Sequence, residues 1–255
     1  MPLANFSLEG KVAIVTGASR GIGRAISIGL AEHGADVVLA ARKPEDLEDA
    51  AQEVKKSGKK ALAIPTNVRR TEELKNLIDE TLKGLGRVDI LVNNAGTNPV
   101  FGPIQEIDER AFDTIMNTNV KAIHFLSAFA REAMLQNESG GSIINVSSLG
   151  GIQASDVIGG YSVSKAALNM LTQVCARTWG KDGIRVNTIS PGLIKTEFAR
   201  ALWDNEKIYN ELVGSSALQR IGLPEDMVGA VVYLASSASS FVTGQNVVLD
   251  GGRHL

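Results

Sequence analysis

Tyr161 and Lys165 are the residues of this sequence whose types and spacing most directly suggest chemistry. They are four positions apart, so on a helix they share one face, with about 5–6 Å between their Cβ atoms. A phenol with an unperturbed pKa of about 10 is a poor proton donor or acceptor at neutral pH. A cation about 5 Å away, at an effective dielectric constant of about 20, would lower that pKa to about 8. The pair therefore predicts a tyrosine general acid–base, although the same spacing often arises by chance.

A glycine-rich turn near the N-terminus is the second chemical signal. Gly17, Gly21 and Gly23 follow an apolar run over 11–15, typical of a buried parallel strand, and lead into a helix-like pattern over 22–33. Such glycines let the backbone turn tightly and approach a pyrophosphate, which rests on the helix N-terminus. The spacing of the three glycines, G-x-x-x-G-x-G, differs from the common G-x-G-x-x-G pattern. The alternative to a dinucleotide site is a tight turn between strand and helix that binds no ligand. The order of strand, turn and helix favours dinucleotide binding.

Five motifs in order make the chain resemble the short-chain dehydrogenase/reductase family, from about Leu8 to Gly252. They are Thr16-Gly17-Ala18-Ser19-Arg20-Gly21-Ile22-Gly23, Asn93-Asn94-Ala95-Gly96, Asn119, Ser148, and Tyr161 with Lys165, followed by Pro191-Gly192. The resemblance implies one α/β domain over 1–255, a Rossmann-type doubly wound parallel sheet of seven strands in the order 3-2-1-4-5-6-7. It also implies an NAD(P)-dependent oxidoreductase acting on CH–OH or C=O groups.

The resemblance assigns the catalytic roles. Tyr161 would donate the proton in carbonyl reduction and accept it in alcohol oxidation, while Lys165 would hold the nicotinamide ribose and lower the tyrosine pKa. Ser148 would hydrogen-bond the substrate oxygen. Ser147 is the competing candidate, but the family commonly places this serine thirteen residues before the tyrosine, as Ser148 is.

The fourth catalytic position is Asn119, which falls within a long predicted helix. By resemblance it would hold a water that links Lys165 to solvent, with Asn117 as the alternative carrier of that role. An asparagine is mildly unfavourable in mid-helix because its side chain competes for backbone hydrogen bonds.

The predicted cofactor is NADP(H), with NAD(H) as the alternative. NAD enzymes of this architecture usually end the second strand in an acid, but here Ala41 holds that position and Arg42 follows it. Arg20 is a second basic residue, and arginine pairs well with a phosphate group. The alternative is that Arg20 and Arg42 are solvated surface charges, as we expect for Lys43. By resemblance the cofactor contacts are Gly17, Ser19, Arg20, Gly21, Ile22, Gly23, Arg42, Asn67, Val68, Asn94, Ala95, Gly96, Tyr161, Lys165, Pro191, Gly192, Ile194 and Thr196. Asn67 is a departure, because many family members have aspartate there, but an amide can make comparable hydrogen bonds.

Composition restricts the other function classes. The net charge is −2 and no basic stripe is present, so nucleic acid and anionic membranes are not expected partners. No apolar run approaches the roughly 18 residues that cross a bilayer, and no secretory signal pattern is present. The single Cys175 suits a reducing compartment, and we expect a cytoplasmic protein. His33, His124 and His254 are widely separated, so no metal site is expected.

Strand-like and helix-like segments alternate along the chain, which predicts βαβ units with right-handed crossovers. The expected strands are 12–16, 36–40, 61–65, 88–93, 142–147, 185–189 and 246–249. The expected helices are 21–33, 44–57, 71–83, 108–136, 161–179 and 224–235. Faces of the helices 108–136 and 161–179, with the tail 247–252, imply a homotetramer by resemblance.

The substrate contacts are expected from 97–101, 150–158 and 193–203, and a two-helix lid from 195–214. The candidate apolar contacts are Ile152, Val157, Ile158, Leu193, Phe198, Leu202 and Trp203, about half of which we expect to pack the lid instead. They favour an apolar or mixed ketone over a phosphorylated sugar. Segments 191–203 and 223–226 resemble a branch of NADPH-dependent carbonyl reductases.

Three functions remain open at this stage. The first is NADPH-dependent reduction of a ketone or aldehyde. The second is NAD-dependent oxidation of a sugar or secondary alcohol at the same site. The third is a nucleotide-binding scaffold or redox sensor without turnover, against which the presence of all four catalytic side chains argues.

Overall fold

Seven parallel strands form one sheet in the order β3-β2-β1-β4-β5-β6-β7, as the sequence predicts. The strands are β1 (Val12–Thr16), β2 (Asp36–Ala41), β3 (Ala61–Pro65), β4 (Ile90–Asn93), β5 (Gly141–Val146), β6 (Ile184–Pro191) and β7 (Asn246–Leu249). The protein is described here as a computed structural model, which covers residues 4–255. The first three residues of the predicted domain 1–255 lie outside the described residues.

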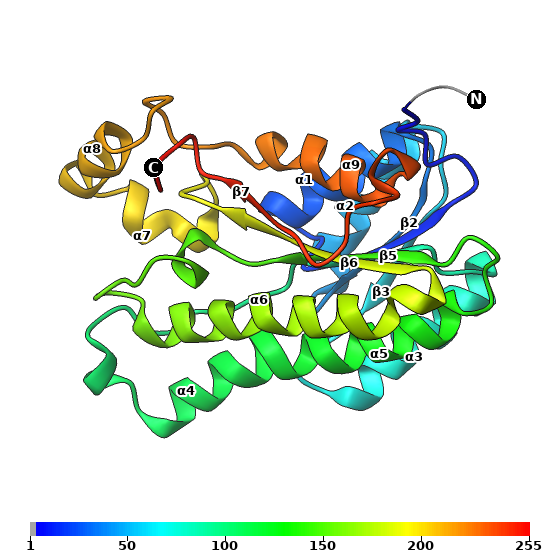
Figure 1. Cartoon of the computed structure of the whole chain (residues 1–255), viewed down its shortest axis with the longest axis horizontal. Helices are drawn as coiled ribbons and strands as arrows, with labels where there is room; N and C mark the ends of the chain where they lie inside the picture. The colour runs from blue at the N-terminus through cyan, green and yellow to red at the C-terminus, as the bar shows by residue number, and fades with distance from the viewer. Residues whose placement is uncertain (1–3) are drawn as a thin grey trace.

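Helices cover both faces of the sheet (Figure 1). The α-helices are α1 (Gly21–Glu32), α2 (Pro44–Lys56), α3 (Thr71–Leu85), α4 (Glu109–Met116), α5 (Ala122–Met134), α6 (Gly159–Trp179), α7 (Arg200–Trp203), α8 (Glu206–Gly214) and α9 (Val228–Ala235). Helices α1, α2 and α9 lie on one face, and α3, α4, α5 and α6 lie on the other. Short 3-10 turns are η1 (Ile104–Glu106), η3 (Leu149–Gly151), η4 (Gly180–Asp182), η5 (Glu197–Ala199), η6 (Pro224–Met227) and η7 (Ser237–Ser239).

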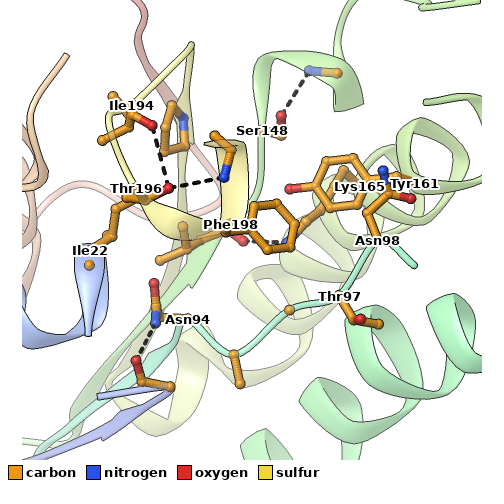
Figure 2. Close-up of a pocket in the computed structure, with 18 of the residues that line it drawn as sticks. Ile22, Asn94, Thr97, Asn98, Ser148, Tyr161, Lys165, Ile194, Thr196 and Phe198 are labelled. Atoms are coloured by element: carbon orange, nitrogen blue, oxygen red, sulfur yellow. Dashed lines mark hydrogen bonds between the residues drawn. The ribbon is translucent and has the colours of Figure 1, made fainter. Parts of the chain in front are cut away.

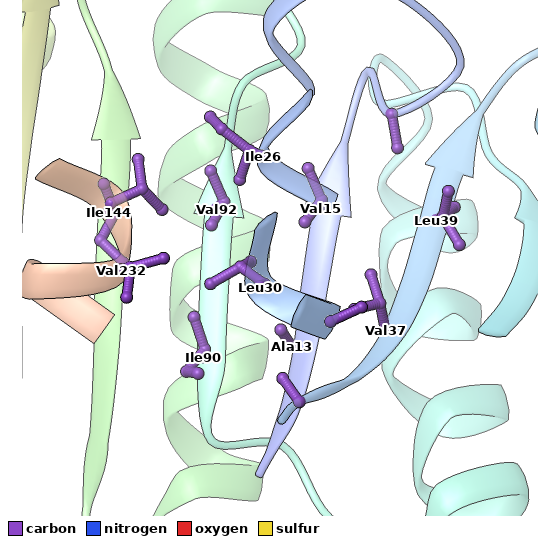
Figure 3. Close-up of a cluster of buried hydrophobic side chains, with 14 of the residues drawn as sticks. Ala13, Val15, Ile26, Leu30, Val37, Leu39, Ile90, Val92, Ile144 and Val232 are labelled. Atoms are coloured by element: carbon purple, nitrogen blue, oxygen red, sulfur yellow. The ribbon is translucent and has the colours of Figure 1, made fainter. Parts of the chain in front are cut away.

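The core explains why the strands are apolar along their whole length. Every residue of β1 is buried, because helices shield both faces of a parallel sheet. Ile26 and Leu30 of α1 and Val232 of α9 pack against Val15 and Ile144 of the sheet (Figure 3). This packing fixes the carboxyl ends of the strands relative to the helices that follow them.

Four strands differ from the predicted bounds: β2 by one residue at its end, β5 by one residue at each end, and β4 and β6 by up to two. β4 starts at Ile90 rather than 88, because its pairing with β1 begins there; the side chain of the preceding Asp89 accepts a hydrogen bond from Val12 N at 3.0 Å. β6 continues to Pro191, because its end pairs with β7 as far as Leu249. Both strand ends lie where backbone pairing, rather than residue type, decides the boundary.

The predicted continuous helix over 108–136 was wrong. A π-helical turn, η2 (Asn117–Lys121), separates α4 from α5. Asn119 lies in this turn, fully buried, and its side chain is bonded to residues outside the helix. An inserted π turn rotates side chains relative to a regular helix and occurs often at functional sites. The helix predicted over 224–235 likewise begins as the 3-10 turn η6 before α9.

Two absences hold for residues 4–255. No helix in this range is long and apolar enough to cross a membrane. No group of three or more histidine, cysteine or acidic side chains is arranged to hold a metal ion there.

Candidate active site

A cavity of about 980 Å³ opens at the carboxyl ends of the strands. Its lining comes from the turn after β1, the ends of β2, β4 and β5, the first turn of α6 and the loop after β6. The strand order reverses between β1 and β4, and open α/β sheets bind their ligands at such a point. The residues predicted for catalysis and cofactor binding line this cavity, with two exceptions. Gly23 and Asn119 lie just outside the lining, in contact with the lining residues Gly17 and Thr97.

The glycine turn has the backbone geometry that the motif predicts. Gly17 and Gly21 have φ values of 64° and 56°, in the left-handed region that favours glycine. Gly23 is required for a different reason, because a Cβ there would lie 2.3 Å from the carbonyl oxygen of Gly17. Helix α1 starts directly after Arg20 without a side-chain cap, so its first amides are free to bind an anion. The turn therefore fits a pyrophosphate.

Asn94 holds the glycine turn against the end of β4. Its Nδ2 donates to the carbonyl oxygens of Thr16 and Gly17, at 2.8 and 3.2 Å. In return, Thr16 Oγ1 accepts from the amides of Asn94 and Ala95, both at 3.0 Å. Because these groups are already paired with protein, Asn94 positions the turn (Figure 2).

Several basic residues line the cavity, among them Arg20 in the turn after β1 and Arg42 at the end of β2. Arg20 and Arg42 are both exposed, and neither forms an ion pair within residues 4–255. The sequence expectation for Lys43 was solvent exposure; it is exposed and also lines the cavity. Ala41 at the strand end carries no charge; the carboxylate of Asp46, in the first turn of α2, also lines the cavity but is exposed to solvent.

Asn67 and Val68 line the same end of the cavity. The Oδ1 of Asn67 accepts from Arg69 N at 3.2 Å, and Glu73 Oε2 accepts from Asn67 N at 2.6 Å. The Nδ2 of Asn67 forms no hydrogen bond within the part of the chain described, and so is free to donate to a base. The departure from aspartate at this position thus leaves a donor facing the site.

Tyr161, Ser148 and Phe198 surround the deeper part of the cavity (Figure 2). The Tyr161 and Phe198 rings lie 6.0 Å apart between centroids. Burial raises the pKa of Tyr161 to about 12, and a side-chain hydrogen bond with Ser148 opposes that rise. Ser148 Oγ also accepts from Gly150 N at 3.1 Å, which orients the hydroxyl at the start of η3. Ser147 also lines the cavity, but its buried hydroxyl already donates to the carbonyl oxygen of Lys165.

Lys165 lies one helical turn from Tyr161 on α6 and is buried. Its Nζ donates to Val146 O at 2.7 Å and lies 5.4 Å from the centre of the Tyr161 ring. Burial lowers the pKa of Lys165 to about 7. We expected Lys165 to lower the pKa of Tyr161, and for the protein side chains by themselves this expectation was wrong. Burial favours the neutral form of both side chains, so it raises the pKa of Tyr161 and lowers that of Lys165.

Asn119 connects the loop after β4 to helix α6. Its Oδ1 accepts from Thr97 N at 2.9 Å, and its Nδ2 donates to Thr97 O and Ser164 Oγ, both at 3.0 Å. Both Nδ2 protons are therefore used by protein groups, and a water held by this side chain would have to donate to Oδ1. Gly96 passes close by, since a Cβ there would lie 3.7 Å from Lys165 Nζ. Asn117 lines a separate surface depression and not the cavity.

The loop after β6 closes the cavity over the glycine turn. A Cβ on Gly21 would lie 3.2 Å from Thr196 Cγ2, so the two loops are in near contact. Gly192 packs tightly on Asp250, where a Cβ would lie 2.8 Å from the Asp250 Cβ. Ile194 is buried, and its neighbour Lys195 is held by a hydrogen bond from its N to Gly222 O at 2.9 Å.

The predicted lid has the two helices expected, α7 and α8, after the extra turn η5. Of the candidate apolar contacts, five line the cavity, namely Val157, Ile158, Leu193, Phe198 and Leu202. Ile152 is exposed outside it, and Trp203 packs the lid with its Nε1 donating to Thr196 O at 2.8 Å. Sequence reasoning missed Glu211, Leu212 and Arg253, which also line the cavity. No local pattern marks them, because the fold of the lid and tail brings them there.

A Rossmann-type sheet with a dinucleotide-binding turn and a tyrosine–lysine pair in one cavity defines a nicotinamide-dependent oxidoreductase. The family model described as Enoyl-(Acyl carrier protein) reductase matches residues 17–254. The chain belongs to the short-chain dehydrogenase/reductase family, whose members act on alcohol and carbonyl groups with NAD(P).

Similar proteins cover the whole length of this chain. Dehydrogenase/reductase SDR family member 4 of Caenorhabditis elegans is 40% identical over 256 residues, covering 99% of this chain and 98% of that protein. The structure of gluconate 5-dehydrogenase from Burkholderia cenocepacia in complex with NADP and tartrate is 32% identical, with a TM-score of 0.94 over 100% of this chain and 99% of that one. NAD⁺-bound xylitol dehydrogenase is 29% identical, with a TM-score of 0.92 over 96% and 99%. The family thus includes both cofactor types.

Proposed function

We propose that this protein catalyses the NADPH-dependent reduction of a ketone or aldehyde to an alcohol, with Tyr161 as general acid. The observation that carries the proposal is that Tyr161 and Ser148 line the same cavity as the glycine turn with Arg20 and the end of β2 with Arg42. One cavity can therefore accept a dinucleotide and a small carbonyl compound side by side.

The residues present fit a nicotinamide dinucleotide. The turn at Gly17 and the free amides of α1 suit the pyrophosphate, Asn67 suits the base, and Lys165 with the loop from Pro191 suits the nicotinamide half. Reduced nicotinamide supplies the hydride when it is bound.

The chain itself supplies the proton and orients the substrate. Because the pKa of Tyr161 is about 12, its hydroxyl keeps its proton at neutral pH and can donate it to a developing alkoxide. The Ser148 hydroxyl, which Gly150 N orients, is hydrogen-bonded to Tyr161 and can donate its proton to the same substrate oxygen instead when a carbonyl compound lies between the two side chains. Phe198 and Leu202 from the lid side give the pocket apolar walls that exclude water.

The preference for NADP(H) rests on charge at the end of β2. Arg20 and Arg42 carry two cations without ion-pair partners among the described residues, and Ala41 replaces the acid that would bind a ribose diol. A 2′-phosphate would pair with either guanidinium. NAD-dependent oxidation of a sugar or secondary alcohol is the second candidate, favoured by the similarity to xylitol dehydrogenase.

A substrate panel tests the proposal. Ketones, diketones, aldehydes and sugars are each mixed with NADPH or NADH, and alcohols with NADP⁺ or NAD⁺, while absorbance of the reduced cofactor is followed. We expect reduction with NADPH to have the highest kcat/KM. Faster turnover of sugars or alcohols with NAD⁺ would favour the second candidate. Tight nucleotide binding without turnover of any compound would instead indicate a scaffold or sensor.

We also propose that the protein is a homotetramer. Exposed apolar side chains on α6, Val163, Met170 and Val174, are 44–58% exposed in the single chain, and Phe241 beside β7 is fully exposed. Apolar surfaces of this kind are typical of subunit contacts. Light scattering coupled to gel filtration tests this, and a monomer would contradict it.

A further inference from the structure

Arg253 lines the cavity from a rigid turn of the C-terminal tail. The Asp250 carboxylate accepts hydrogen bonds from the amides of Gly252 and His254, both at 2.9 Å, so the residues on each side of Arg253 are anchored. The carbonyl oxygen of Gly251 in turn accepts from Leu218 N at 3.0 Å. The tail therefore lies against the segment that follows α8, beside the lid (Figure 1).

The charge of Arg253 is not satisfied by the protein. Its side chain is half-buried and lines the cavity, and it forms no ion pair or hydrogen bond within residues 4–255. The nearest acid in sequence, Asp250, is already paired with His254 Nδ1 at 2.8 Å. A guanidinium that is partly removed from water and has no partner favours binding an anion, and its planar fork matches a carboxylate.

Four acidic residues also line the cavity, and none forms an ion pair with Arg253 within residues 4–255; Asp46, on α2, is exposed. Glu197 is paired with Arg200, and Asp156 and Glu211 are exposed. Water and salt screen the attraction between these exposed carboxylates and Arg253, so it is weak, whereas the half-buried guanidinium is screened less from an anion bound in the cavity.

We propose that Arg253 binds a carboxylate of the substrate, so that the carbonyl compound reduced by this protein is a keto acid. The apolar wall formed by Leu193, Phe198 and Leu202 would contact the carbon chain between the two groups. This assignment of substrate class rests on the proposed reductase function. It gives Arg253 a role in specificity, distinct from the proton transfer at Tyr161.

The test compares each acid with its own neutral ester. Reduction of 4-oxopentanoate, 5-oxohexanoate and 6-oxoheptanoate, and of their methyl esters, is measured with NADPH on the full chain. The variants are Arg253→Met, which removes the charge, and Arg253→Lys, which keeps it; Lys207→Met, an exposed lid residue outside the cavity lining, is the control. The series of acids covers different distances between the carbonyl and the carboxylate.

We expect at least one acid to exceed its ester in kcat/KM by about ten-fold or more in the parent protein. Arg253→Met should abolish that ratio mainly by raising KM for the acid, with the ester unchanged, while Arg253→Lys should retain part of it and Lys207→Met all of it. Equal rates for acids and esters would overturn the inference. So would an equal loss on both in Arg253→Met, which would assign Arg253 to a lid or subunit contact. Reduction of neutral ketones alone would overturn this inference only, whereas no reduction of any carbonyl compound would also overturn the proposed function.

Discussion

Lys165 places its Nζ 5.4 Å from the centre of the Tyr161 ring and donates from the same atom to Val146 O at 2.7 Å. The lysine is therefore fixed by the end of β5, and the tyrosine by the first turn of α6. Both groups are shielded from water, which raises the pKa of Tyr161 to about 12 and lowers that of Lys165 to about 7. The arrangement keeps the proton on the phenol at neutral pH, the state needed for reduction.

Replacing Tyr161 by phenylalanine should remove the proton donor while leaving the pocket shape intact. We expect kcat for carbonyl reduction to fall by about 10²- to 10⁴-fold, the usual contribution of a positioned general acid. Cofactor affinity, measured by fluorescence titration with NADPH, should stay within about three-fold, since 1.4 kcal/mol corresponds to about ten-fold in binding. Normal turnover by the Tyr161→Phe variant would exclude Tyr161 as the acid.

Lys165 should make stability depend on pH. Its folded pKa of about 7 is below the ordinary value of 10.5, so the unfolded chain binds more protons between these values. Below about pH 7 the buried lysine is charged, and it lowers the unfolding free energy by its largest amount. As the pH rises from about 7 to 10.5 this destabilisation disappears, so the unfolding free energy increases.

The variant Lys165→Met removes this buried charge and the activity with it. We expect its melting temperature relative to the parent to be highest near pH 7 and to decline as the pH approaches 10, because the parent lysine becomes neutral. Thermal melts across this range measure the difference. Lys181→Met, at an exposed site, is the control and should show no such trend. A difference for Lys165→Met that does not change with pH would contradict the assignment.

The sheet, its strand order and the residues at strand ends could be predicted, because apolar periodicity and glycine motifs are local signals. Tyr161 and Ser148 follow this rule, since each lies just after a strand or at the start of a helix. The π turn at Asn119 could not be predicted, because the apolar pattern continues through it and tertiary hydrogen bonds create it. Arg253 was missed for a similar reason: hydrogen bonds to Asp250 and Gly251 fold the tail over the cavity.

The double variant Arg20→Ala, Arg42→Ala tests the cofactor preference. Each guanidinium can form a charge-assisted pair with a 2′-phosphate, and neither has an ion-pair partner in the range 4–255 that its loss would leave unpaired. We expect KM for NADPH to rise by about 10- to 100-fold and KM for NADH to change little. Steady-state kinetics with both cofactors measure the two values. Unchanged affinity for NADPH would show that these arginines are solvated surface charges.

Gly23 should be intolerant of even one added methyl group. A Cβ at this position would lie 2.3 Å from Gly17 O and 2.5 Å from Asn94 Nδ2, so Gly23→Ala must displace the turn that Asn94 holds. The matched control is Gly229→Ala on α9, because a Cβ there meets nothing within 4 Å. Gly229 is the second residue of α9, so this change should stabilise the protein by no more than the roughly 0.5–1 kcal/mol found in helix interiors.

We expect Gly23→Ala to weaken NADPH binding and to lower the melting temperature, and Gly229→Ala to leave NADPH binding unchanged while raising the melting temperature slightly. Fluorescence titration and thermal melts of the two variants measure both effects. The comparison separates loss of the turn from the general effect of alanine in a helix, because both sites are helical glycines with negative φ. If Gly23→Ala bound NADPH as the parent does, the close approach of α1 to the Gly17 carbonyl would not be what shapes the pyrophosphate site.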